Sequence, residues 1–255
     1  MKKPLILVTN DDGITAPGIR ALIGIAKDFG DVVVVAPDGP QSGMGHAITI
    51  NSTLRCDQIH VDDGLQKEFA CSGTPVDCVK LAVNKILERK PDLCISGINH
   101  GSNSSINVIY SGTMSAAVEG ALEGIPSIGF SLLDFSFDAD FSASKKVASD
   151  LIKTVLNEKL PKGVCLNVNI PKLPIDKIKG YKICRQANAN WVEEFDERKD
   201  PSGRTYFWLT GSFQNFDKGT DTDEWALANN YVSIVPVKFD VTSYESISFL
   251  KSWKL

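Results

Sequence analysis

Four short apolar runs constrain the fold of this chain more than any other feature. They are residues 4–9 (PLILVT), 31–37 (DVVVVAP), 91–97 (PDLCISG) and 126–132 (PSIGFSL). The first three run directly into polar loops that contain glycine. Hydrophobicity within the runs is continuous rather than alternating and is rich in Val and Ile, which is typical of strands covered on both faces. The runs therefore predict a sheet buried between two layers.

Helical patterns lie between and after these strands. They cover residues 18–30, 74–88, 113–124 and 142–158, and a fifth strand at 163–170 follows the last of them. In the first helix Ile19, Leu22 and Ile23 share one stripe, with Pro17 near its start. Strand alternating with helix predicts an α/β fold with a doubly wound, mostly parallel sheet over residues 1–171.

The chain changes character after Pro171. Residues 180–239 contain three strand candidates without intervening helices, KICRQ, RTYFWLTG and NNYVSIVPVKF, and the polar ANANWVEEFDERKDPSG between the first two is expected to be a loop. Residues 172–255 are therefore predicted to be a β-rich extension with a C-terminal β-hairpin. Its terminal helix opens with a capping-box pattern, Thr242 with Glu245. Residues 47–55 are expected to be a further β segment.

Composition and charge restrict the class of protein. The 255 residues are 43% hydrophobic and 23% charged, as in an ordinary globular enzyme, and the net charge of −4 provides no basic field for nucleic acid. The six cysteines show no CxxC spacing, so reduced and buried thiols are expected. No run approaches the roughly 20 apolar residues of a membrane span. A cytoplasmic protein without a stable nucleic-acid complex is predicted.

Three polar loops follow strands and should open onto one edge of the sheet, because ligands bind outside the carboxyl ends of parallel strands. The first loop (NDDG) contributes Asn10, Asp11 and Asp12, the second loop (DGPQSGMGH) contributes Ser42, and the third loop (INHGSNSSINVIY, leading to Ser111) contributes Asn99. A divalent cation would offset the repulsion between the two adjacent carboxylates, and hard oxygen ligands suit Mg²⁺ or Mn²⁺ rather than zinc. The alternative is an Asp-Gly turn with solvated acids.

A phosphate site is predicted where Ser111, Gly112 and Thr113 deliver the chain to a helix start, because free amides and the helix dipole favour anions there. Thr113 could instead serve as the N-cap. The similar start at residues 72–75 is interpreted as structural capping. His100 is either a proton donor or substrate contact, or an exposed loop residue without a role. GxSxG, GxGxxG and GxxxxGK[ST] are absent, which argues against a serine hydrolase, a dinucleotide-binding fold and a P-loop.

Four ordered motifs resemble the SurE (survival protein E) family of metal-dependent nucleotidases. They are NDDGITAPGI, VVVVAPDGPQSGMGHAIT, SGTPVDCV and PDLCISGINHGSNSSINVIYSGTMSAAVEGALEGIPSIGFSL. The resemblance covers the first 135 residues strongly and continues more loosely to the end, where YVSIVPVKFDVT looks like the family's C-terminal strand. It implies a Rossmann-like α/β domain with a C-terminal hairpin exchanged between subunits, and hence a homodimer or homotetramer.

The resemblance also implies the roles of particular residues. The metal ligands would be Asp11, Asp12, Ser42 and Asn99, the phosphate contacts Asn103, Ser111, Gly112 and Thr113, and the catalytic residues Asp11, Asp12 and Asn99. The implied cofactor is one divalent cation per subunit, Mg²⁺ or Mn²⁺. In contrast to many family members, the loop PDGPQSG carries no basic residue, and SSIN stands where acidic residues are common.

The reaction that follows is hydrolysis of nucleoside 5′-monophosphates, and of 3′-monophosphates, to nucleoside and phosphate. The alternative is a non-catalytic nucleotide- or phosphate-binding module, although pure anion binding needs no acid pair. A sugar-nucleotide transferase is a third hypothesis. It would need a second nucleotide-binding domain, which the region after residue 171 is too short and too β-rich to supply.

Overall fold

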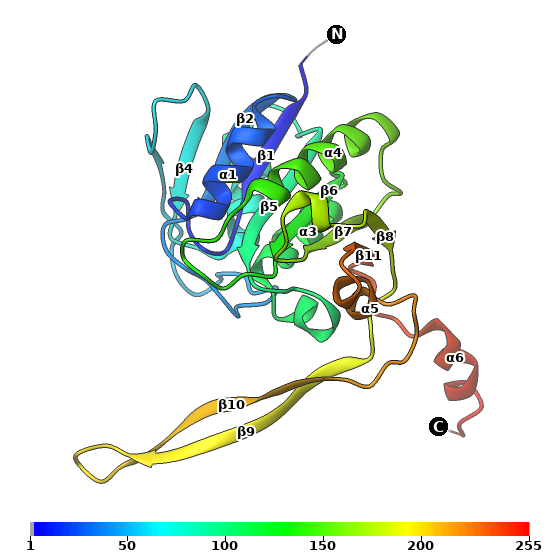
Figure 1. Cartoon of the computed structure of the whole chain (residues 1–255). Helices are drawn as coiled ribbons and strands as arrows, with labels where there is room; N and C mark the ends of the chain where they lie inside the picture. Colours follow the sequence, from blue (N-terminus) through cyan, green and yellow to red (C-terminus); the bar gives the residue numbers. More distant parts are fainter. Residues whose placement is uncertain (1–2, 255) are drawn as a thin grey trace.

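A nine-stranded sheet forms the body of the protein in a computed structural model that describes residues 3–254 (Figure 1). The strand order is β3-β4-β2-β1-β5-β6-β7-β11-β8. The strands are β1 (Leu5–Thr9), β2 (Asp31–Pro37), β3 (Cys56–Ile59), β4 (Lys67–Cys71), β5 (Leu93–His100), β6 (Ser127–Leu132), β7 (Val164–Ile170), β8 (Tyr181–Ile183) and β11 (Val232–Lys238). The six strands β4-β2-β1-β5-β6-β7 pair in parallel, which confirms the predicted doubly wound, mostly parallel sheet.

Helices cover both faces of the sheet. They are α1 (Pro17–Ala26), α2 (Pro75–Leu81) continued by the π-helix η1 (Ala82–Ile86), α3 (Gly112–Leu122), α4 (Ser142–Glu158), α5 (Asp223–Ala228) and α6 (Tyr244–Leu250), with short 3-10 turns η2 (Ser105–Ile109) and η3 (Ile175–Lys177). Helices α1 and α4 contact each other on one face, and α2 and α3 on the other. Because side chains alternate along a strand, Ile6 and Val8 pack into the core beneath α1 and α4, whereas Leu7 joins the core beneath α2.

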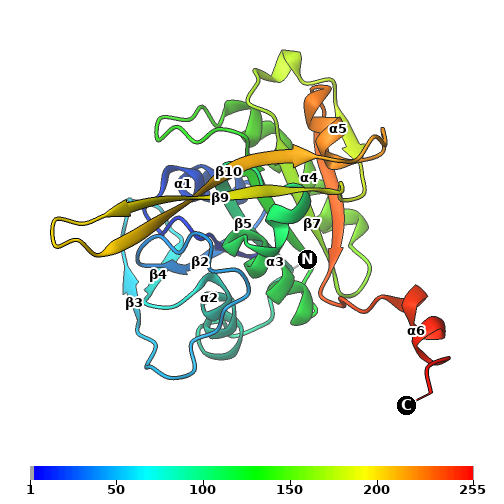
Figure 2. The same ribbon diagram turned by 90° about the horizontal axis from the view of Figure 1, so that it is seen from below.

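The sheet continues across the expected boundary at Pro171. Strand β11 pairs antiparallel with β7 and parallel with β8, so the C-terminal segment completes one edge of the sheet. The hairpin β9 (Ala189–Lys199) and β10 (Thr205–Asn215) forms a separate two-stranded sheet. It leaves the body on the side where the parallel strands end, and a view from below shows it crossing in front of the body (Figures 1 and 2). The predicted C-terminal hairpin is confirmed.

Three local expectations are corrected. The polar segment expected to be a loop is strand β9, which pairs with β10 along its whole length. Residues 47–55, all within the described part of the chain, contain no strand, and the β segment is β3, which pairs with β4. Helix α6 begins after Ser243 without a side-chain cap, so the expected Thr242 capping box does not form.

The cysteines divide into two groups. Cys56 and Cys71 lie directly opposite each other in the β3–β4 pair and are joined by a disulfide, which corrects the expectation of reduced thiols at this pair. Cys78, Cys94, Cys165 and Cys184 are free and buried, as expected. Among residues 3–254, no helix combines the length and apolar character that crossing a membrane requires.

Candidate active site

Asp11 and Asp12 follow the carboxyl end of β1, as predicted. Burial raises the pKa of Asp11 to about 6, against the lowering effect of hydrogen bonds from Thr113, and the neighbouring charge of Asp12 adds to the rise. Burial also raises the pKa of Asp12, and nearby His100 opposes this shift. Two adjacent carboxylates held away from water are costly unless a positive group compensates them.

The N-terminus of α3 packs directly against Asp11. The hydroxyl of Thr113 donates to the Asp11 carboxylate, and a Cβ on Gly112 would lie only 2.7 Å from Cβ of Asp11. Ser111 is the N-cap, since its Oγ accepts from the backbone N–H of Met114 at 3.0 Å. The alternative in which Thr113 caps the helix is therefore wrong. The structure brings the predicted metal-binding and phosphate-binding segments together.

Ser42 lies in the exposed loop that follows β2. The preceding residue, Gln41, donates its backbone N–H to the carbonyl of Asp11 at 2.7 Å. Further along the loop, Nε2 of His46 lies 2.9 Å from Oε2 of the buried Glu119 in α3. These contacts attach the second loop to both the first loop and the helix, and they place Ser42 one residue from the Asp11 contact.

Asn99 and His100 end β5. The pairing of β5 with β6 shifts in register between Ser96 and Asn99, and such a bulge re-aims the side chains that follow it. Nδ2 of Asn99 donates to the carbonyls of His100 and Gly101 at 3.2 and 3.0 Å, which leaves its Oδ1 as an acceptor. The His100 ring packs edge-on against Phe141 with centroids 5.3 Å apart. Strand β5 pairs with β1, with Ser96 opposite Thr9, so the third loop leaves the sheet beside the first.

Asn103 is held by a buried amide network instead of facing the carboxylates. Its Nδ2 donates to Oγ of Ser131 at 2.7 Å, and its backbone N–H donates to Oδ1 of Asn169 at 2.8 Å. Its carbonyl accepts from Nδ2 of Asn167 at 2.8 Å. Sequence reasoning missed Asn167 and Asn169, although two asparagines inside the apolar strand VCLNVNI were a usable signal. No hydrogen bond within residues 3–254 joins Asn103 to Asp11.

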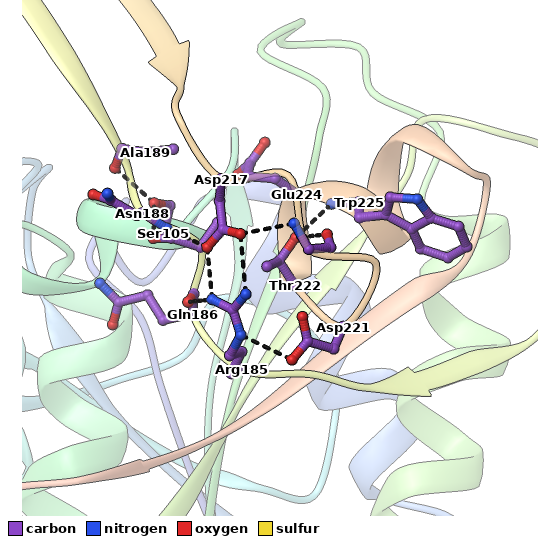
Figure 3. Close-up of polar contacts among 12 residues, drawn as sticks. Ser105, Arg185, Gln186, Asn188, Ala189, Asp217, Asp221, Thr222, Glu224 and Trp225 are labelled. Carbon is purple, nitrogen blue, oxygen red and sulfur yellow. Dashed lines mark hydrogen bonds and ion pairs between the residues drawn. The ribbon is translucent and has the colours of Figure 1, made fainter.

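Ser105 connects the third loop to the root of the hairpin (Figure 3). It is fully buried and has a left-handed backbone with φ of 51°. Its backbone N–H donates to Oδ2 of Asp223 at 2.8 Å, and its Oγ lies 2.9 and 2.7 Å from the carbonyls of Ala187 and Ala189. Oδ1 of Asp223 accepts from the backbone N–H of Ala187 at 2.9 Å. Residues remote in sequence thus fix the path of the chain toward α3.

Arg185 joins two acidic residues, Asp217 and Asp221, in the segment that follows the hairpin. Nη1 of Arg185 donates to Asp217 at 2.6 Å and its Nε donates to Asp221 at 2.9 Å, with the guanidinium lying between the two acids in Figure 3. Its hydrogen bonds hold the pKa of both carboxyls below their ordinary value. Ser104 in addition donates to Glu224 at the start of α5. The hairpin root, α5 and the third loop therefore form one connected polar unit.

The second helix start is a structural cap, as expected. Oγ1 of Thr74 accepts from the backbone N–H of Asp77 at 3.1 Å, and Oδ2 of Asp77 accepts from the backbone N–H of Thr74 at 3.0 Å. Asp77 also accepts from the backbone N–H of Thr49 at 3.1 Å and from its hydroxyl at 2.6 Å. Both carboxylate oxygens are occupied, so this helix start presents a closed capping box.

The donor atoms at the edge of β1 and β5 fit a hard cation. Four of the seven buried side-chain N or O atoms without a hydrogen-bond partner in residues 3–254 lie here, namely Thr9 Oγ1, Asn10 Oδ1, Asp12 Oδ2 and Ser96 Oγ. A buried carboxylate oxygen without a partner is costly, and a divalent cation is a partner suited to it. No group of three or more His, Cys, Asp or Glu in the same residues could hold a metal ion.

The chain is similar to known proteins in both sequence and fold. The profile of the family described as "Survival protein SurE" matches residues 6–193. A protein of Christiangramia forsetii named 5′-nucleotidase SurE is 66% identical over all of this chain and 98% of its own length, and one of Flavobacterium johnsoniae with the same name is 65% identical with the same coverage. The crystal structure of a SurE protein from Aquifex aeolicus superposes with a TM-score of 0.84 at 42% identity, covering 97% of this chain and 98% of that one.

Fold and site define a Rossmann-like α/β protein whose oxygen-rich acidic site adjoins a helix N-terminus. Sequence and structural similarity both extend over nearly the whole chain. The chain belongs to the SurE family.

Proposed function

We propose that this chain is a divalent-metal-dependent phosphatase that hydrolyses nucleoside 5′-monophosphates, and 3′-monophosphates, to nucleoside and phosphate. One observation carries the proposal: the N-terminus of α3 lies against the carboxylate of Asp11. A carboxylate suited to a cation and amides suited to an anion therefore adjoin, which is what a phosphate bound beside a metal ion requires. Relatives at 66% and 65% identity carry the name 5′-nucleotidase.

The proposed ligands of one Mg²⁺ or Mn²⁺ ion per subunit are Asp11, Asp12, Ser42 and Asn99. Asp11 is oriented by Thr113, Asp12 offers an unpartnered oxygen, and the amide of Asn99 is fixed with Oδ1 available. When bound, the ion would supply Lewis acidity toward a phosphoryl oxygen.

The chain's own groups would position the phosphoryl group and the attacking water. The N-terminal turn of α3, Ser111 to Thr113, would stabilise negative charge on the phosphoryl oxygens, so that catalysis is chiefly positioning and electrostatics. Asp11 or Asp12 would accept a proton from the water. Asn103 would contribute through its place in the amide network that fixes the loop.

The proposed assembly is a homodimer or homotetramer formed through the β9–β10 hairpin, in the cytoplasm. One face of the hairpin carries Trp191, Phe195, Phe207, Leu209 and Phe213, which the strand register places together. Phe195 and Leu209 are directly paired and are 65% and 63% exposed. An isolated ribbon with an apolar face has little stability in water unless that face is covered, and a second copy of the chain is the proposed cover.

The test measures inorganic phosphate released from a panel of 5′- and 3′-nucleoside monophosphates with Mg²⁺, with Mn²⁺ and with a chelator. Asp11→Asn should lower kcat/KM by more than about 100-fold. Loss of a residue that only supports a metal ligand typically lowers activity about 10- to 100-fold, and loss of a ligand should lower it further. Asp176→Asn, at an acid 67% exposed on its side chain, is the matched control and should leave kcat/KM unchanged.

Thermal unfolding supplies a second readout. A saturating divalent cation should raise the Tm of the wild type, by the equivalent of about 2.7 kcal/mol at 100 times the Kd. The rise should be absent in Asp11→Asn. Phosphate release that persists in chelator, or a folded Asp11→Asn with normal turnover, would contradict the metal assignment. Metal-dependent nucleotide binding without turnover would favour the non-catalytic binding module.

A further inference from the structure

Two phenylalanines stand in solvent beside the candidate site. Phe135 and Phe137 are 84% and 81% exposed and belong to the loop of residues 133–141, which follows the carboxyl end of β6. That edge of the sheet also carries the ends of β1 and β5, and with them the acidic site. Aromatic rings normally bury most of their area, so two such rings in one site-edge loop suggest a ligand.

Phe135 touches the third loop directly. Gly101 has φ of +96°, and a Cβ built on it would lie 2.3 Å from Cε1 of Phe135, so the ring edge rests on the glycine backbone. The carbonyl of Gly101 accepts from Nδ2 of Asn99 at 3.0 Å, and its backbone N–H donates to Leu132 at 2.8 Å. Gly101 is therefore in contact with both the ring of Phe135 and the side chain of Asn99, a proposed metal ligand.

The loop that presents Phe135 is fixed in place. The backbone N–H of Leu133 donates to the carbonyl of Ile170 at 2.9 Å. Oδ1 of Asp134 accepts from the backbone N–H of Ser136 and from Nζ of Lys172, each at 3.0 Å. A ring that is exposed yet held by its flanking residues is preorganised for stacking and loses little entropy on binding.

We propose that Phe135 is the nucleobase platform of this site, with Phe137 extending it; the inference rests on the proposed nucleotidase function. In a nucleoside monophosphate the ribose separates the base from the phosphate, so a base platform must lie beside the phosphate site and outside it. Phe135 lies against the loop that carries Asn99, a proposed metal ligand, and therefore adjoins the site. Stacking on an aromatic ring suits every base, because every base has a π face. The platform therefore selects nucleotides over sugar phosphates and discriminates weakly among bases.

The test compares a nucleotide with its baseless analogue. Adenosine formation from adenosine 5′-monophosphate gives KM, and the same assay with added ribose 5-phosphate gives the Ki of the analogue, whether or not the enzyme cleaves it. Phe135→Ala should raise KM for the nucleotide about 5- to 150-fold, the range for loss of one base–aromatic stack, while the Ki of ribose 5-phosphate changes less than twofold. Phe135→Tyr should keep KM within threefold of wild type.

Phe239→Ala is the matched control. Phe239 is 47% exposed and its ring also lies near a glycine, Gly163, just before the start of β7 at the opposite edge of the sheet. This variant should change neither KM nor Ki. Phe137→Ala should show a smaller rise in KM than Phe135→Ala.

Each contrary outcome has a distinct meaning. Equal changes in KM and Ki, or no change in either, overturn the platform. A loss of subunit association in Phe135→Ala with unaltered KM for the nucleotide also overturns it and identifies the ring as a subunit contact. Absence of adenosine formation by the wild type with any divalent metal refutes the proposed nucleotidase function instead. In that case equilibrium binding of adenosine to wild type and Phe135→Ala still decides the platform.

Discussion

The hydroxyl of Thr113 donates a hydrogen bond to the carboxylate of Asp11, 102 residues earlier in the chain. This bond joins the first turn of α3 to the loop after β1, and it orients one carboxylate oxygen of Asp11. Two segments predicted separately, one for a cation and one for a phosphate, thereby become one site.

Gly112 permits this close approach, and Gly112→Ala tests it. The added Cβ would lie 2.7 Å from Cβ of Asp11 and 2.9 Å from its Oδ2, so the helix or the carboxylate must move. We expect kcat/KM to fall more than about 100-fold, with a loss of about 1–3 kcal/mol in the free energy of unfolding. Steady-state kinetics and urea denaturation measure the two effects.

The matched control is Gly24→Ala in α1. A Cβ there meets nothing within 4 Å, so the variant should be about 0.5–1 kcal/mol more stable than wild type and fully active. A fully active Gly112→Ala would show that α3 need not contact Asp11.

Asp223 should determine how firmly the hairpin root holds the third loop. Asp223→Ala leaves the buried backbone N–H groups of Ser105 and Ala187 without acceptors, at about 1–3 kcal/mol each. We expect a matching loss in urea denaturation and a rise of at least about tenfold in KM for the nucleotide. Asp221→Ala, which removes only an exposed partner of Arg185, should leave KM unchanged. Equal kinetic effects of the two variants would contradict a specific role for Asp223.

Asp77 gives the protein an acid-sensitive contribution to stability. Burial raises the pKa of Asp77, but hydrogen bonds from Thr49 and Thr74 outweigh burial and lower the pKa below its ordinary 3.8. A depressed carboxyl pKa contributes stability that is present above pH 3.8 and lost as the pH falls through the folded-state pKa. Asp77→Asn should cost about 1–2 kcal/mol in urea denaturation at pH 7. The difference from wild type should shrink below pH 3.8; a constant difference would exclude the ionised form as its source.

The apolar face of the hairpin should control subunit association. Phe195 and Leu209 form a direct cross-strand pair, and changing both to Ser removes the centre of that face. We expect sedimentation velocity to show a smaller species than wild type, with the α/β body still folded by circular dichroism. The control pair is Glu194→Ser with Thr210→Ser, which are paired directly on the opposite face. An unchanged sedimentation coefficient in the first variant would place the subunit contact elsewhere.

The sheet and the acidic loops were predictable because their signals are local. Runs such as DVVVVAP bury both faces, and the loops that follow them must share one edge. Strand β9 was missed because its own sequence is polar. It is a strand because its backbone pairs with β10. Ser111 caps α3, whereas the hydroxyl of Thr113 bonds to Asp11. This tertiary contact could not be predicted from the capping preferences of serine and threonine.

The supports of the third loop could not be predicted from the loop itself. Asn167 and Asn169 come from β7, and Asp223 comes from α5, more than 60 and more than 100 residues away along the chain. Each acts by accepting or donating one hydrogen bond to the loop backbone. Such pairings depend on the folded arrangement, because nothing in a window around Asn103 or Ser105 specifies its partner.

The place of β11 in the sheet has a consequence for synthesis of the protein on the ribosome. β11 covers the edge of β7, yet the hairpin β9–β10 and α5 are made between the two strands. A nascent chain that has made β7 but has not reached Val232 therefore leaves the edge of β7 open. Open edges pair readily with other chains, so the stretch from Ile170 to Lys238 is the interval of elongation in which shielding by a chaperone matters most.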